Sequence, residues 1–87
     1  MGIIESSVLD YIKRRIEAGA LSVSEAEIMD AVVPADHPEF RARPVYRYCL
    51  ARLLRRRVIN AVDARDGTRH FLIGKYPSVA LRKSLGI

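Results

Sequence analysis

Cysteine and long apolar runs are nearly absent from this sequence. Its single cysteine, Cys49, allows no intramolecular disulfide. No stretch approaches the roughly 18 consecutive apolar residues of a membrane-spanning helix, and the first residues lack the basic and then apolar pattern of a secretory signal. These absences exclude a disulfide-stabilised secreted scaffold, and we expect a cytoplasmic protein that does not enter a membrane.

Groupings of residues that carry out catalysis are lacking as well. The two histidines lie apart, His37 in a proline-flanked loop and His70 in a predicted strand, and Cys49 falls on a predicted core face. No combination of His, Cys and carboxylates has the spacing of a metal site, and no glycine-rich run is present to hold a phosphate. We expect no catalytic residues, no metal and no cofactor, so the chain is not predicted to be an enzyme.

Length and composition limit the architecture. With 87 residues, of which 49% are hydrophobic and 29% charged, the chain suits a single small globular domain, 1–87. Such a domain buries about 60–65% of the surface that its unfolded chain exposes. Glutamine is absent and asparagine occurs once, while charged residues are frequent, a composition that favours a thermophilic source.

Acidic residues are missing from one stretch, whose basic charge is the best sequence clue to function. Between Phe40 and Val62 the chain has seven arginines and no Asp or Glu. The net charge is +5, to which this stretch contributes +7, residues 1–39 contribute −5 and residues 63–87 contribute +3. Phosphate neutralisation supplies most sequence-independent affinity for nucleic acid, so a concentrated arginine surface indicates a polyanion partner. Arg-rich helices also occur on solvated surfaces and at protein interfaces, and charge alone leaves these readings open.

Helical periodicity and punctuation mark the first predicted helix. Apolar residues recur at spacings of three and four over residues 5–18, which predicts a helix with one apolar stripe. Gly19 follows at the position where a left-handed C-cap is favoured. Residues 21–23 form a short apolar link that is able to pair as a strand. The chain is therefore predicted to pass from one amphipathic helix through a short extended segment.

A second helix is predicted over residues 24–32. Ser24 and Glu27 have the spacing of a capping box at its start, and Pro34 stops it. The segment 34–42 contains two prolines and is predicted to be a loop, with room for one helical turn.

The second half is predicted to hold one more long helix and a hairpin. A proline in the first turn and continuous apolar spacing predict a helix over 44–57 with one apolar and one basic face. Segment 58–73 has two runs rich in β-branched and small residues around an Asp66-Gly67 turn, which predicts a β-hairpin. A short closing helix is predicted over 78–85.

The apolar faces of these elements define a predicted core. It consists of Val8, Leu9, Ile12, Ile16, Ile28, Val32, Val45, Cys49, Leu50, Leu53, Leu54, Ile59, Phe71 and Ile73. Tyr46 is expected in this core, whereas Tyr48 suits either packing or contact with a ligand. The predicted class is α+β, mostly α.

The order of the predicted elements, helix, short strand, helix, helix and hairpin, resembles the winged helix-turn-helix fold, a three-helix core with a β-hairpin wing, here followed by a short C-terminal helix. The resemblance covers about residues 5–76. It rests on Ser24-Glu25-Ala26-Glu27-Ile28, on the run from Arg43 to Ile59, and on Asp66-Gly67-Thr68-Arg69-His70-Phe71. The run is similar to the recognition helix and first wing strand of small bacterial and archaeal transcriptional regulators of the penicillinase-repressor type. In this chain Arg57 stands where that family usually has glycine, and about ten residues, instead of a few, connect the second and third helices.

The resemblance implies a surface for double-stranded DNA on the third helix and the wing. The third helix would enter the major groove and present Arg47, Tyr48, Ala51 and Arg52 to base edges. Arg43 and Arg55 would contact phosphates, and the wing residues Arg65 and Arg69 would reach the adjacent backbone or minor groove. The expected DNA-binding residues are Arg41, Arg43, Arg47, Tyr48, Arg52, Arg55, Arg65 and Arg69.

The expected function is sequence-specific or architectural DNA binding by a small, nucleoid-associated transcriptional regulator. The alternative is a winged-helix module that docks an acidic protein or RNA within a larger complex. One winged helix reads only a short half-site, so we expect a homodimer that pairs through the chain ends. The apolar residues there are Ile3, Ile4, Val79, Leu81, Leu85 and Ile87. The alternative for these residues is that they cap the core of a monomer.

Overall fold

The computed structural model describes residues 2–42, 44–74 and 77–87. These ranges form an α+β, mostly helical structure with a small antiparallel sheet. In chain order its elements are α1 (Ile3–Glu17), β1 (Val23–Ser24), α2 (Glu25–Val32), the 3-10 helix η1 (Pro38–Ala42), α3 (Pro44–Arg55), β2 (Asn60–Asp63), β3 (Arg69–Leu72) and α4 (Val79–Leu85). The coarse fold class predicted from the sequence is confirmed.

The helix boundaries follow the punctuation in the sequence. Gly19, just beyond α1, has a φ of +105°, a conformation open to glycine because it has no Cβ. The Ser24 side chain accepts a hydrogen bond from the backbone N–H of Glu27, which confirms Ser24 as the N-cap of α2. The loop predicted over 34–42 contains one short helix, η1. Local chemistry therefore fixes where the first two helices begin and end.

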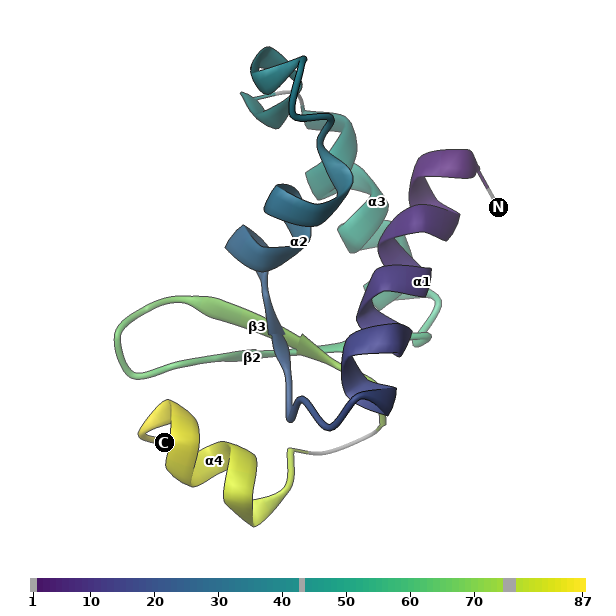
Figure 1. Ribbon diagram of the computed structural model, residues 1–87. Coiled ribbons are helices and arrows are strands. Elements are labelled where there is room, and N and C mark those ends of the chain that lie inside the picture. Colours follow the sequence, from purple (N-terminus) through teal and green to yellow (C-terminus); the bar gives the residue numbers. More distant parts are fainter. Residues whose placement is uncertain (1, 43, 75–76) are drawn as a thin grey trace.

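The sheet has the strand order β1-β3-β2, and all of its pairs are antiparallel. The predicted hairpin is confirmed, with Asp63 opposite Arg69 and Gly67 in its turn at a φ of +90°. Its strands are shorter than the predicted runs, since β2 begins at Asn60 and β3 ends at Leu72. Figure 1 shows the hairpin lying between the three helices α1, α2 and α3 on one side and α4 on the other.

Two apolar clusters hold these layers together. The main one joins α1, α2 and α3 to β1 and β3, and its buried residues are Val8, Leu9, Ile12, Val23, Ile28, Met29, Tyr46, Leu50, Leu53, Ile59 and Phe71. The second consists of Leu72, Leu81 and Leu85, with Val62 and Ala64 packed against it. Burial of apolar side chains stabilises a fold roughly in proportion to the area buried, so the larger main cluster is the principal source of stability.

The second cluster corrects one core assignment. Ile73 was predicted to be buried, but it is 39% exposed, and the preceding Leu72 is buried instead. Successive side chains on a strand point to opposite faces, so Phe71 packs among the helices while Leu72 packs on α4. Because α4 covers the second face of the hairpin, both residues are buried before the strand ends.

The same cluster accounts for two of the apolar residues near the chain ends. Leu81 and Leu85 are buried inside the chain, whereas Ile3, Val79 and Ile87 are exposed. The two termini lie at opposite ends of the structure (Figure 1). None of the helices within the described ranges combines the length and apolarity required to cross a membrane.

Candidate functional site

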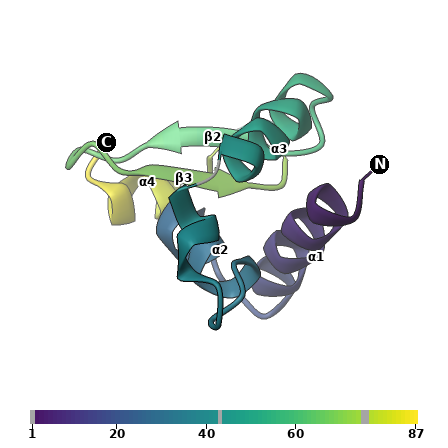
Figure 2. The same ribbon diagram turned by 90° about the horizontal axis from the view of Figure 1, so that it is seen from above.

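The outward face of α3 is basic, as its periodicity predicted. Tyr46, Cys49, Leu50 and Leu53 are buried, whereas the opposite side of the helix carries exposed residues. These are Arg47, Tyr48, Ala51, Arg52 and Arg55. Figure 2 shows α3 and the hairpin along one side of the molecule and α1 and α2 along the other. Because α3 itself has no acidic residue, this side is the candidate site.

The end of α3 leads almost directly into the hairpin. The N–H of Val58 donates to the carbonyl of Leu53 at 3.1 Å, and the N–H of Arg57 donates to that of Leu54 at 3.0 Å. This pair of bonds is a Schellman motif, which needs a left-handed residue after the helix. Arg57 occupies that position with a φ of +59°, and among the described residues it is the one non-glycine with positive φ.

Arg47 and Arg69 meet across a cleft between α3 and β3. The cleft has a volume of about 180 Å³ and is lined by Glu25, Arg47, Leu50, Ala51, Leu54, Arg69 and Phe71. Nε of Arg47 lies 3.4 Å from Oε1 of Glu25, although 82% of the Arg47 side chain is exposed. Arg69 donates a hydrogen bond of 3.0 Å from Nε to Asp63, which lowers the pKa of that carboxyl. The structure therefore brings one helix arginine and one hairpin arginine together around a carboxylate.

Arg52 lies on the other flank of α3, against α1. Its Nε is 3.4 Å from Oε1 of Glu5, and Nη1 of Arg56 is 3.7 Å from Oε2. Glu5 is only 3% exposed, and neither of its carboxylate oxygens has a hydrogen bond within the described residues. A buried carboxylate is costly without a counter-charge, so Arg52 and Arg56 neutralise it. Arg52 also stacks 5.9 Å from the ring centre of Tyr48, which is 58% exposed.

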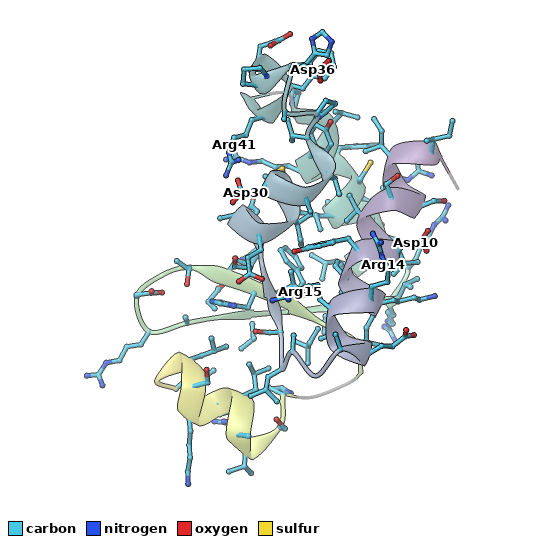
Figure 3. All side chains as sticks on the ribbon, viewed as in Figure 1. Asp10, Arg14, Arg15, Asp30, Asp36 and Arg41 are labelled. Atoms are coloured by element: carbon cyan, nitrogen blue, oxygen red, sulfur yellow. The ribbon has the colours of Figure 1, made fainter. Side chains whose placement is uncertain are left out.

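Arg41 lies apart from the α3 face and pairs with α2. Its Nη1 donates to Oδ1 of Asp30. Figure 3 shows the two side chains directed toward each other, on the side of the molecule that also carries Asp10, Arg14 and Arg15. This side is of mixed charge. Arg43, expected beside Arg41 in the interface, lies outside the described residues.

The two remaining arginines have different surroundings. Arg55 is exposed, and no ion pair forms to it within the described residues. Arg65 is in the hairpin turn, where its backbone N–H donates to the carbonyl of Leu85 at 2.9 Å. This bond fastens the turn to the end of α4. Arg65 and Arg69, expected to act as a pair, therefore face different neighbours.

A hydrogen-bonded chain runs from the hairpin turn along β3 to Ser22. Thr68 donates to Asp66 at 2.6 Å, and its hydroxyl lies 3.1 Å from Nε2 of His70, whose Nδ1 is 3.2 Å from the hydroxyl of Ser22. Hydrogen bonds from Thr68 also lower the pKa of Asp66. Since Thr68 gives its proton to an ionised carboxylate, His70 donates to Thr68 from Nε2. The chain ties the turn to Ser22, which directly precedes β1.

Cys49 and the potential metal ligands are the remaining side chains to place. Cys49 is buried, and burial, together with the charge of Glu5, raises the pKa of its thiol. Within the ranges that the structure describes, no three His, Cys, Asp or Glu side chains gather closely enough to hold a metal ion. The chemistry that the site offers is ionic and stacking contact, from arginines and Tyr48.

Comparisons with protein-family models, with curated proteins and with solved structures found no match.

The sequence did not predict the carboxylates that pair with these arginines. Glu5 precedes Val8 and Leu9 by three and four residues, so it lies on the apolar stripe of α1, and that position was a signal of its burial. Glu25 gave no such signal, because its contact with Arg47 depends on how α2 packs beside α3.

Proposed function

We propose that this chain binds double-stranded DNA through α3 and the β2–β3 hairpin. The observation that carries the proposal is the arginine face of α3, which continues across the cleft to Arg69 without an acidic residue on the helix itself. Arginines on a convex helix match phosphates and guanine edges by bidentate hydrogen bonds. Tyr48 adds an exposed ring for stacking or phosphate contact.

The arrangement of elements supports a winged helix-turn-helix as the frame for this activity. The hairpin of the β1-β3-β2 sheet shares a cleft with the third helix, an arrangement typical of a wing beside a recognition helix. Arg57 adopts the left-handed conformation at the position where the resembling regulators have glycine. In this frame α3 is the recognition helix, and the protein acts as a small nucleoid-associated transcriptional regulator.

The surroundings of each arginine suggest its task on DNA. Arg47, whose side chain is 82% exposed, suits a base edge, and the exposed Arg55 suits a phosphate. Arg69 and Arg65 suit the backbone beside the hairpin. Arg52 is partly committed to Glu5, so it contributes mainly positive potential.

The proposal is tested by fluorescence anisotropy with a mixed-sequence duplex at several salt concentrations. If about five phosphates are neutralised, log K against log salt has a slope near −4 to −5. Arg47→Ala is expected to cost about 1–3 kcal/mol in binding, since it removes an exposed α3 contact.

Arg14→Ala is the matched control, because Arg14 has the same charge and lies on the mixed-charge side of α1 (Figure 3). It is expected to change affinity less than twofold. Equal affinities for the wild type and the Arg47 variant at low salt contradict DNA binding through α3.

A second candidate function is docking of an acidic protein segment. The observation in its favour is a cleft of about 360 Å³ between α1 and α3, lined by Ile3, Ile4, Val45, Tyr48 and Arg52 among others. This lining combines apolar surface with a guanidinium, and Arg52 already pairs with a carboxylate, that of Glu5 in the same lining. Competition with poly-glutamate separates the two functions. Poly-glutamate should displace an acidic partner completely. It should displace duplex DNA no more than a simple salt of equal ionic strength does.

A further inference from the structure

The cleft between α3 and β3 contains a carboxylate in the middle of the basic side. Glu25 is the first residue of α2, and its side chain is 35% exposed. It lines this cleft together with Arg47 and Arg69. It also lines the neighbouring cleft of about 470 Å³ at the hairpin turn, again with Arg69. Glu25 and Arg69 therefore form the wall between two hollows.

The contacts of Glu25 are ionic and loosely held. Its distance of 3.4 Å to Nε of Arg47 is longer than a normal charged hydrogen bond, and Arg47 is mostly exposed. Arg69 is held first by its hydrogen bond to Asp63, and Glu25 adds a further favourable charge interaction. An exposed ion pair of this kind contributes little to stability and exchanges readily for another anion.

A phosphate group offers these two arginines the same partner that Glu25 offers. Both are anions whose oxygens accept from guanidinium N–H groups, and both favour a position between two cations. A phosphate that approaches Arg47 and Arg69 must displace the Glu25 carboxylate or remain near its negative charge. Either course lowers the affinity for phosphate, by about three- to tenfold for one charge at contact distance in water.

We propose that Glu25 is an internal competitor for phosphate, which neutralises Arg47 and Arg69 in the unbound chain and limits the affinity for mixed-sequence duplex DNA. The inference rests on the proposed DNA-binding function. It assigns Glu25 a role in specificity: a backbone phosphate that replaces this carboxylate gains little, because it only takes over an existing charge interaction, so tight binding depends on a base edge that engages Arg47 bidentately.

Glu25→Gln tests the inference, and Glu27→Gln is the matched control. Glu27 lies in the same first turn of α2 and is similarly exposed, but it pairs with Arg15 of α1 at 3.6 Å. Both variants raise the net charge by one. Glu25→Gln is expected to bind a mixed-sequence duplex three- to tenfold more tightly than wild type at low salt. Its salt slope should be steeper by about one, because a further arginine releases its counterion. Glu27→Gln should change affinity less than twofold.

A second measurement does not depend on duplex DNA. Inorganic phosphate is titrated while the NMR signals of the arginine Nε–H groups are followed. In Glu25→Gln the Arg47 and Arg69 signals should respond at phosphate concentrations at least threefold lower than in wild type or Glu27→Gln. Glu25→Ala is measured alongside. If one of the two Glu25 variants has a folding defect, the other still tests the competitor role.

The outcomes separate the two proposals. If wild type binds duplex and both glutamine variants bind equally, the competitor role is overturned and DNA binding stands. If no variant binds duplex but phosphate still discriminates Glu25→Gln, DNA binding fails and the competition for phosphate is supported. If phosphate also fails to discriminate, the competitor role is overturned as well.

Discussion

The buried carboxylate of Glu5 depends on the positive charge of the arginines beside it. Within the described residues this carboxylate has no hydrogen bond, and the guanidiniums of Arg52 in α3 and of Arg56 just after it supply the counter-charge. Removing one partner of a buried ion is more damaging than removing an exposed charge, because the remaining ion stays desolvated. Arg52 is therefore a structural residue as well as part of the basic face.

A comparison of Arg52→Ala with Arg55→Ala checks this assignment. Arg52→Ala is expected to lower the free energy of unfolding by about 1–3 kcal/mol, less than for a fully buried pair because Arg56 remains. Arg55→Ala should change it by less than about 0.5 kcal/mol, since Arg55 is exposed and forms no ion pair among the described residues. Urea denaturation measures both, and equal effects would show that Glu5 does not depend on Arg52.

Arg57 adopts a left-handed backbone conformation just after the end of α3. Glycine adopts this conformation without the steric cost that a Cβ brings. Arg57→Gly is therefore expected to stabilise the fold by about 0.5–1 kcal/mol in thermal or urea unfolding. Ala51→Gly, at an exposed position inside the helix, should destabilise it by about 1 kcal/mol. Loss of stability in Arg57→Gly would mean that the arginine side chain contributes more than the strain costs.

At the scale of elements, the two apolar clusters divide the chain into a tightly packed part and an appended one. α1, α2 and α3 share the main cluster with the sheet, whereas α4 packs on the hairpin through Leu81 and Leu85. A seven-residue helix has little intrinsic stability, so its order depends on those two side chains. Its capping by Ser78 and the bond from Arg65 to Leu85 supplement them.

Truncation of one leucine in each cluster should reveal this division. Leu53 is fully buried at the centre of the main cluster, and Leu53→Ala is expected to cost about 2–5 kcal/mol in global stability. Leu81→Ala should cost less and act locally, by opening α4 while the rest stays folded. Amide hydrogen exchange distinguishes the cases: in Leu81→Ala only residues of α4 and the hairpin turn should lose protection. Uniform loss of protection would show one cooperative unit.

At the scale of the whole molecule, the distribution of exposed apolar residues bears on self-association. The expected homodimer contacts included Leu81 and Leu85, but these are buried inside the chain. The start of α1 still presents Ile3, which is 87% exposed, and Ile4, beside the α1–α3 cleft. A pairing surface at this end is smaller than one that used both termini.

Light scattering with matched variants tests pairing at the α1 end. If the chain forms a dimer there, Ile3→Glu should yield monomer, because it places charge in an apolar contact. Val79→Glu is the control, since Val79 is 72% exposed on α4 at the far end, and it should leave the dimer mass unchanged. A wild-type chain that stays monomeric at high micromolar concentration would refute the homodimer.

The sequence predicted the parts of this fold that depend on local spacing. The structure confirms the apolar stripe of α1, the Ser24 cap and the Asp66-Gly67 turn. Each of these features depends on residues that are close together in the sequence. The burial of Leu72 instead of Ile73 was not predictable, because it requires knowledge that α4 covers the hairpin.

The sequence predicted which arginines form the candidate site, but not the carboxylates with which they form ion pairs. The exposed arginines of α3 followed from the helical projection, and their exposure is confirmed. The contacts of Arg47 with Glu25 and of Arg52 with Glu5 join residues more than 20 positions apart, so they depend on the angles at which helices pack. Sequence periodicity carries no information about those angles.

The two-residue strand β1 has a consequence for the order in which the chain folds. Val23 pairs with Phe71, 48 residues further along, so this pairing closes a loop that contains α2, η1 and α3. Helices form in about a microsecond, whereas a contact across so long a loop must first overcome the entropy of closing it. The three helices are thus expected to collapse early, and the pairing of β1 with β3 to complete the native state last. The chain should therefore fold more slowly than a three-helix bundle of the same length.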